Sequence, residues 1–318
     1  MRVGIFVSEA WGPGSPIGEI RERALRAEAL GYPSAWVPYL PWSLDSLASM
    51  QAAGEATSRI EIGSAVIPTF FFHPLAMARQ AATVQAAIGR PIHFGIGCSN
   101  PAIVAMHGLA FERPARHVRE YLEVLNAAFE VGTKPGGPRE QAAFVQYEGE
   151  VFKMGSIYGT PGAEKMGSVL VGAMGPKMLE VTGAYSDGVI ATWCDEGAIE
   201  RDIVPPVRAS AAKAGRVEPK VASVVATAIV PRSKIAPARD AAQEEFGFYE
   251  QNMPYQRVVE ASNASRIAEI CVIGDEEEVA RRLRGYRDAG MTDFLAAPYE
   301  VEGADWESTA SKLATIDY

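Results

Sequence analysis

Short runs of β-branched and other apolar residues alternate along the chain with longer segments in which apolar residues recur every three or four positions. The short runs are typical of buried strands, and the longer segments are typical of amphipathic helices. We expect strands at residues 3–7, 35–37, 60–67, 92–96, 169–171, 188–192, 221–230 and 293–297. We expect helices at 17–30, 44–57, 74–87, 116–131, 198–214, 236–249 and 275–289, one that begins at Pro176, and one around Arg257.

This alternation of strands and helices predicts an α/β fold, a (β/α)8 TIM barrel, with a doubly wound parallel sheet as the alternative. The chain has 318 residues and no linker that would divide it, so we expect a single domain over residues 1–318. Residues 132–165 break the alternation, because they are rich in glycine and proline and contain a hairpin signal at residues 147–150. We interpret them as an insertion after the fourth helix that either covers a site or decorates the surface.

Composition excludes several classes of protein. The net charge is −9 and no basic run occurs, so we expect no nucleic-acid partner. The cysteines Cys98, Cys194 and Cys271 are isolated, which favours a reducing compartment, and the histidines lack metal-ligand spacing, so we expect no metal site. Without a secretion signal or a run long enough to span a bilayer, we expect a cytoplasmic protein that does not contact membranes. Barrel helices often pair, so we also expect a homodimer.

In a barrel of this type, function lies in the loops that follow the strands. Here those loops are apolar and aromatic, contain glycines at two places and hold few carboxylates. Such a rim suits a large planar ring with a phosphorylated tail better than a metal ion or a sugar. Packing beneath the rim is the alternative for each aromatic residue taken singly. The loops are Pro38–Trp42, Pro68–Pro74, Gly95–Asn100, Gly172–Lys177 and Thr192–Cys194.

One of these loops has the pattern of an anion site. The apolar run Val169–Val171 leads into the glycine loop Gly172–Gly175, and Pro176 begins a helix, where its missing N–H costs nothing. Free backbone N–H groups and the positive end of the helix dipole suit a phosphate, and Lys177 adds a positive charge. An ordinary turn without a ligand is the alternative.

A series of segments covers nearly the whole chain in order. The segments are 30–37, 57–69, 73–74 with 79–85, 94–97, 113–117 with 119–125, 172–179 with 187–188, and 289–295. Together they resemble the bacterial luciferase-like monooxygenase superfamily, in its branch that uses the deazaflavin coenzyme F420. The resemblance implies a TIM barrel with an insertion and a coenzyme at the carboxyl rim.

The resemblance also implies the composition of the coenzyme site. Residues 172–178 would hold the coenzyme phosphate, in agreement with the interpretation of the glycine loop. A cis peptide bond between Ala65 and Val66 would lie against the ring. The residues that the resemblance places in the coenzyme site are Ala65, Val66, Thr69, Gly97, Cys98, Ser99, Gly172, Ala173, Met174, Gly175, Pro176, Lys177, Met178, Thr192 and Trp193.

The implied reaction is hydride transfer between the deazaflavin and a small organic substrate, because a deazaflavin has carbon where a flavin has its reactive nitrogen. Some members place an acidic residue or a histidine after strand two, where this chain has Tyr39, and some place a glutamate after strand four, where it has residues 98–100. Tyr39 and His107 are therefore the candidate catalytic proton donors. The alternatives are a monooxygenase of the same fold that uses reduced FMN, and a non-catalytic protein that binds a flavin or deazaflavin.

Overall fold

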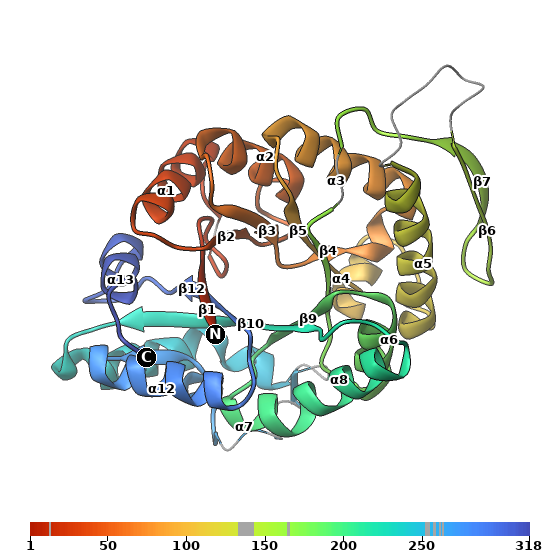
Figure 1. Ribbon diagram of the computed structural model, residues 1–318. Coiled ribbons are helices and arrows are strands. Elements are labelled where there is room, and N and C mark those ends of the chain that lie inside the picture. Colours follow the sequence, from red (N-terminus) through yellow and green to blue (C-terminus); the bar gives the residue numbers. More distant parts are fainter. Residues whose placement is uncertain are drawn as a thin grey trace.

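The computed structural model describes residues 1–318 except 13, 133–142, 164–165, 252–254, 257–258, 261 and 263. Within these residues, eight parallel strands close into a barrel, because β12 pairs with β1 and β9 pairs with β10. Figure 1 shows this ring inside a ring of helices, which confirms the expected TIM-barrel fold. In ring order the strands are β1 (Arg2–Phe6), β2 (Ser34–Val37), β3 (Glu61–Ser64), β5 (Ile92–Gly97), β8 (Ser168–Gly172), β9 (Gly188–Thr192), β10 (Lys220–Ile229) and β12 (Asp293–Pro298).

The helices follow the predicted pattern, with additions. The helix expected at 198–214 is a continuous helical run whose middle part, η3, has the wider π geometry, and the helix expected around Arg257 lies outside the described residues. The long helices are α1 (Ile17–Ala29), α2 (Ser46–Ala56), α3 (Pro74–Ile88), α5 (Pro114–Gly132), α6 (Pro176–Tyr185), α8 (Val204–Lys213), α9 (Ile235–Phe246), α12 (Glu276–Asp288) and α13 (Trp306–Leu313). The short ones are η1 (Thr69–Phe71), α4 (Pro101–Met106), α7 (Glu196–Ala198), η3 (Ile199–Ile203), η4 (Arg232–Lys234), η5 (Gly247–Gln251) and α11 (Ile267–Ile270).

The prediction of one continuous third strand at residues 60–67 is wrong. It is divided into β3 and the short β4 (Ile67–Pro68), and the two residues between them, Ala65 and Val66, are joined by the expected cis peptide bond. Before the break, the hydroxyl of Ser64 bonds to both the N–H and the carbonyl of Gly95 at 3.0 Å, so a side chain takes the place of backbone pairing. Pairing with β5 resumes at Ile67.

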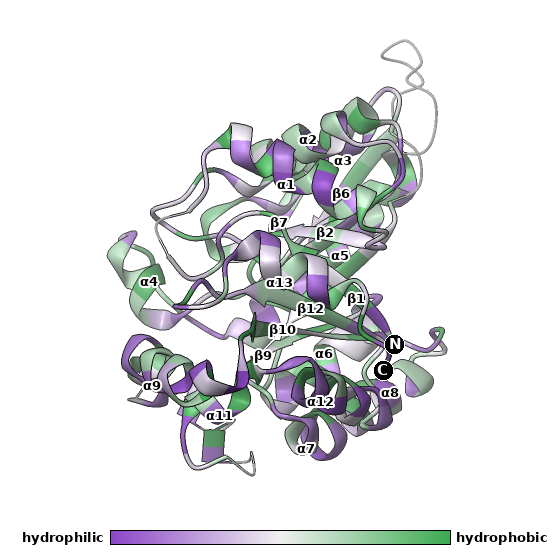
Figure 2. Cartoon of the chain, turned by 90° about the vertical axis from the view of Figure 1, so that its left-hand side faces the viewer, coloured by the Kyte–Doolittle hydropathy of each residue, from purple (hydrophilic) through white to green (hydrophobic). Residues whose placement is uncertain are grey.

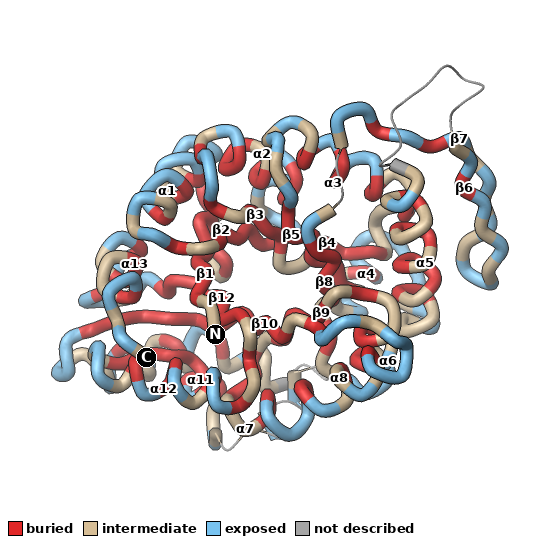
Figure 3. The backbone as a smooth tube through the Cα atoms, in the orientation of Figure 1, coloured by how far each residue is buried: buried red, intermediate tan, exposed pale blue. Residues whose placement is uncertain are grey.

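The barrel interior is packed with side chains. Phe6, Trp36, Leu170 and Leu295 are almost fully buried within one cluster in the ring of strands. Figure 3 shows that the barrel strands are almost entirely buried, whereas the outer faces of the helices are exposed. The interior is therefore a core and not a pore, and any ligand must lie at the end of the barrel.

The described part of the insertion forms the expected hairpin, with β6 (Ala143–Glu148) antiparallel to β7 (Lys153–Tyr158). It lies outside the ring of helices, beyond α5 in Figure 1. The buried carboxylate of Glu120 on α5 accepts hydrogen bonds from the N–H groups of Val151 and Phe152 at 2.8 and 3.1 Å. The hairpin is thus attached to the outer side of α5. Three elements were not predicted from the sequence, namely β11 (Val272–Gly274), α4 and α13.

Among the described residues, no helix combines the length and the apolar character that crossing a bilayer requires.

Candidate active site

The carboxyl ends of the parallel strands gather at one end of the barrel, which is where barrel enzymes place their sites. Figure 2 shows α4 and α9, which follow β5 and β10, at the edge of the molecule opposite the two chain termini. We call this end the carboxyl rim. The loops named from the sequence follow β2, β4, β5, β8 and β9, so they all leave strands on this side.

The structure brings together three of the predicted coenzyme residues, Val66, Gly97 and Gly172. Gly97 and Gly172 end β5 and β8 and pair directly with each other. A Cβ added to Gly97 would lie 2.8 Å from Cγ2 of Val66, and a Cβ added to Gly172 would lie 3.0 Å from the same atom. Val66 therefore leaves no room for a side chain at Gly97 and little room for one at Gly172.

Gly175, the residue before α6, differs from Gly97 and Gly172 because open space surrounds it. A Cβ added there would meet no protein atom within 4 Å, and no side chain caps the helix. The first N–H groups of a helix have no partner within it, so the start of α6 presents free donors beside open space. The loop itself is fixed, because the N–H of Ala173 donates to the carbonyl of Ile190 at 3.3 Å. This arrangement fits a phosphate.

The other residues predicted in this loop surround the helix start. Pro176 is the first residue of α6, as expected, and Lys177 is exposed. Met174 and Met178 are partly buried against the main core. Within the described residues, Lys177 takes part in no ion pair, so its charge is available to an anion.

The loop after β5 turns sharply at Ser99, whose φ of 63° is unusual for a residue with a side chain. The turn leads into α4, where the side chain of Asn100 accepts a hydrogen bond from the N–H of Ala102 at 2.8 Å. Cys98 is partly buried, and this burial raises the pKa of its thiol to about 11. At neutral pH Cys98 is therefore a thiol and not a reactive thiolate.

His117 on α5 holds the loop after β4, a role that the sequence did not reveal because His117 lies within an ordinary helical pattern. Its ring donates a hydrogen bond to the carbonyl of Thr69 and stacks on Phe70, with ring centres 3.9 Å apart and planes within 4°. Burial lowers the pKa of His117 to about 4, so the ring is neutral. Thr69 itself is buried within η1.

Both candidate proton donors lie beside Phe71. Tyr39 is half-buried and its ring centre lies 6.1 Å from that of Phe71, while His107 stacks on Phe71 at 4.0 Å. Burial, and then the nearby Asp45, raise the pKa of Tyr39, so it keeps its proton at neutral pH. His107 is exposed at the end of α4 and its Nδ1 lies 2.8 Å from the carbonyl oxygen of Ile103.

Trp193, which follows β9, belongs to a group of aromatic side chains that we call the rim aromatic cluster. It is 3% exposed and has a φ of 54°, in the left-handed region. Its neighbour Thr192 is partly buried at the end of β9. The cluster consists of Trp11, Trp193, Phe246, Tyr249 and Tyr299.

Sequence reasoning missed four members of this cluster. Trp11 and Tyr299 follow β1 and β12, so the rule that loops after strands form the site could have found them. Phe246 and Tyr249 lie in the helical segment after β10 and carried no signal in the pattern. Tyr255 adjoins Tyr249 with ring centres 5.1 Å apart.

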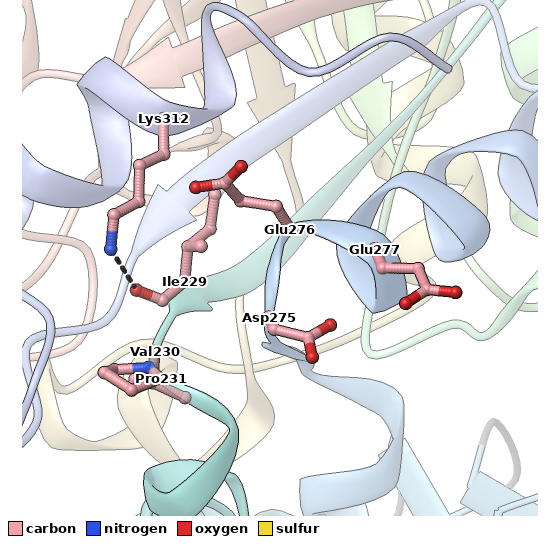
Figure 4. Close-up of a pocket in the computed structure, with 7 residues that line it drawn as sticks. All are labelled: Ile229, Val230, Pro231, Asp275, Glu276, Glu277 and Lys312. Carbon is pink, nitrogen blue, oxygen red and sulfur yellow. Dashed lines mark hydrogen bonds between the residues drawn. The ribbon is translucent and has the colours of Figure 1, made fainter.

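A groove of about 310 Å3 lies between the end of β10 and the start of α12 (Figure 4). The Nζ atom of Lys312 donates to the carbonyl of Ile229 at 3.4 Å on one side, and Asp275 lies on the other. None of the predicted site residues lines this groove. In the described part of the chain, no group of three or more histidine, cysteine, aspartate or glutamate side chains could hold a metal ion.

A closed parallel barrel defines a (β/α)8 protein, and the uncapped start of α6 is a candidate anion site at its carboxyl rim. The chain belongs to the luciferase-like monooxygenase family, whose model matches residues 1–293. It is therefore a luciferase-like oxidoreductase.

The chain is also similar to individual proteins and, in fold, to solved structures. The chain is 28% identical to an F420-dependent glucose-6-phosphate dehydrogenase of Kribbella flavida, over 93% of this chain and 91% of the relative. Among solved structures it is similar to the coenzyme F420-dependent tetrahydromethanopterin reductase of Methanopyrus kandleri, with a TM-score of 0.76, 22% identity and coverage of 99% and 97%. It is also similar to a riboflavin lyase solved with modified FMN, with a TM-score of 0.79, 13% identity and coverage of 99% and 90%.

Proposed function

We propose that the protein is an F420-dependent oxidoreductase that transfers a hydride between the coenzyme and a small organic substrate. The choice of F420 is supported by the relative of Kribbella flavida, which is named for this coenzyme and matches almost the whole chain. When bound, the coenzyme supplies two-electron hydride chemistry, and the protein supplies binding, orientation and a dry site.

The observation that carries the proposal is the start of α6. Gly175 has open space where a side chain would be, the helix is uncapped, and Lys177 adds an available positive charge. In this proposal the N–H groups of the glycine loop bind the phosphate of the coenzyme tail, and Val66 supports the ring. Residues 97–99 and Thr192 would lie at the borders of the ring site.

The side chains near the proposed ring site fall into two groups: neutral groups, and groups that could exchange a proton with the substrate. The pKa of Cys98 is raised and that of His117 is lowered, so both side chains are neutral and neither adds charge beside the ring site. Tyr39 keeps its proton at neutral pH, so its hydroxyl can donate a hydrogen bond to a substrate oxygen or transfer a proton to it. His107 is the second group that could exchange a proton with the substrate.

The test is a titration of the purified protein with F420 and with FMN, followed by ring fluorescence, for the wild type and for Gly175→Ala. The new methyl group of Gly175→Ala meets no protein atom within 4 Å, so it should leave the fold intact and obstruct only the phosphate. We expect F420 binding that weakens about tenfold or more in the variant, the equivalent of one lost charge-assisted hydrogen bond.

Gly18→Ala is the matched control, because a Cβ at Gly18 in α1 also meets nothing within 4 Å and the position lies on another helix. It should bind F420 as the wild type does. Binding of FMN without F420 would favour the monooxygenase alternative instead. Binding of F420 without any substrate-dependent oxidation or reduction of it would favour a non-catalytic carrier.

A further inference from the structure

The turn of the insertion hairpin, residues 149–152, is fixed to α5 by a buried carboxylate. The side chain that carries it, Glu120, is 1% exposed. Its two oxygens accept hydrogen bonds from the N–H groups of Glu150, Val151 and Phe152 at 3.2, 2.8 and 3.1 Å. Hydrogen bonds to a charged acceptor are about twice as strong as those between neutral groups. These bonds give Phe152, the last residue of the turn, a fixed place beside α5.

Phe152 lies beside two histidines that hold opposite ends of the loop after β4. Its ring centre lies 5.2 Å from that of His117, whose ring donates a hydrogen bond to the carbonyl of Thr69 where the loop begins. It lies 6.0 Å, edge to face, from the ring centre of His73, the cap residue where the loop ends and α3 begins. Phe152 is also packed against the main core. The hairpin turn therefore contacts both residues that fix the ends of this loop.

The loop contains one helical turn, η1, which His117 holds in place. The carbonyl of Thr69 accepts a hydrogen bond from the ring of His117 and another, at 3.4 Å, from the N–H of Phe72, which closes the turn. Phe70 stacks on the same histidine ring, with 3.9 Å between the ring centres. Because packed groups transmit a displacement to their neighbours, a shift of the His117 ring would shift the whole turn.

Both candidate proton donors contact this turn through Phe71. The ring of His107 stacks on that of Phe71, with centres 4.0 Å apart and planes within 22°. The ring centre of Tyr39 lies 6.1 Å from that of Phe71 and 6.3 Å from that of Phe72. A continuous series of contacts thus begins in the insertion and ends at the two donors. Within the described part of the chain, no ring contact joins Phe152 directly to either donor.

We propose that Phe152 and His117 are positioning residues, through which the insertion hairpin holds η1 and sets the place of the candidate proton donors. This role differs from the two that the sequence left open for the insertion, a cover over the site and a surface decoration. The effect on turnover rests on the proposed function, because it requires a substrate that exchanges a proton with Tyr39 or His107. The effect on structure does not, so the two effects can be tested separately.

NMR of the histidine side chains tests the structural effect without coenzyme or substrate. The chain has four histidines, so few imidazole C–H signals need to be separated, and the spectrum of His107→Gln identifies the signal of His107. Stacking on Phe71 places His107 in the ring current of that side chain. In Phe152→Ala we expect the His107 signal to move towards that of an unstacked imidazole. In Phe152→Leu, which keeps most of the apolar volume, the signal should move less.

Two further variants locate the effect. Phe144→Ala on the same hairpin is the matched control, because Phe144 is 60% exposed, and it should leave the His107 signal in place. His117→Leu removes the ring that links Phe152 to η1 and should move the signal in the same direction as Phe152→Ala does. If Phe152 acts through His117, the double variant should move the signal by less than the sum of the two single shifts.

Turnover tests the catalytic effect. With a substrate that the F420-loaded protein accepts, Phe152→Ala should lower kcat about tenfold or more, because a small misplacement of a catalytic group is costly. The Kd of F420, followed by ring fluorescence, should keep its wild-type value, because the series of contacts leads to the donors and not to the start of α6. Phe144→Ala should change neither quantity.

Each result decides between named alternatives. An unmoved His107 signal in Phe152→Ala, or an equal movement in Phe144→Ala, overturns the inference. Wild-type kcat in Phe152→Ala overturns its catalytic part. Weakened F420 binding in Phe152→Ala would place the insertion in the coenzyme site and would also overturn the inference. Failure of the wild type to bind F420 contradicts the proposed function alone, and the NMR result still decides whether the hairpin positions the loop.

Discussion

Cγ2 of Val66 leaves no room for a side chain at Gly97, because a Cβ added to Gly97 would lie 2.8 Å from this atom. The contact joins the break after β3 to the end of β5. It explains why a strand that is otherwise rich in bulky residues ends in glycine.

Gly97→Ala should therefore lower the free energy of unfolding by about 1–3 kcal/mol, the usual cost of overpacking a buried site. Urea unfolding of the wild type, Gly97→Ala, Val66→Ala and the double variant measures it. Because Val66→Ala removes the obstructing methyl group, the double variant should be destabilised by less than the sum of the single variants. Strict additivity would show that the contact is not the reason for glycine.

The buried His117 should make stability depend on pH. Its pKa is about 4 in the folded protein and 6.5 ordinarily, so between these values the unfolded chain binds more protons. The stabilising contribution is therefore complete above about pH 6.5 and is lost as the pH falls towards 4. Between pH 7 and pH 5 the wild type should lose about 2 kcal/mol more than His117→Gln, measured by urea unfolding at both pH values. An equal loss in both proteins would contradict this assignment.

Arg282 should be a main support of the segment that precedes β11. Its guanidinium bonds to the carboxylate of Glu196 at 2.5 Å and to the carbonyls of Glu269 and Cys271 at 3.0 and 3.3 Å. Arg282→Met leaves these acceptors unpaired and should cost about 3 kcal/mol or more. Arg287→Met on the same helix removes an exposed pair with Asp288 and should cost less than about 1 kcal/mol. Similar costs for the two variants would be inconsistent with this role.

The proton donor can be assigned with two variants. If Tyr39 donates the proton, Tyr39→Phe should lower kcat about 100-fold or more, the usual contribution of general acid catalysis, with F420 affinity unchanged. If His107 donates it, His107→Ala should have this effect. Steady-state turnover of a substrate that the F420-loaded protein accepts gives the measurement. Wild-type turnover in both variants would exclude both residues and indicate that solvent supplies the proton.

The sequence was sufficient to predict the barrel because each strand is a short apolar run bounded by helical periodicity. It could not place the break after β3, since Ala65 and Val66 run without a polar interruption into Ile67; only the resemblance indicated the cis peptide bond. The short α4 and β11 contain too few residues to show a period.

Site prediction had a different limit. The resemblance predicts Val66, Gly97 and Gly172 in one site, and the structure places the three residues beside one another. Phe246 and Tyr249 lie on a helical segment, where an aromatic residue looks like any core position. The role of His117 depends on its neighbours in space, namely Thr69 and Phe70, and these are remote in sequence.

The most direct measurement is a crystal structure of the protein with oxidised F420. The proposed function predicts the coenzyme phosphate within about 3 Å of the backbone N–H groups at the start of α6, with the ring against Val66 at the carboxyl rim. A coenzyme bound elsewhere, for instance in the groove between Lys312 and Asp275, or a rim left empty at saturating F420, would contradict it.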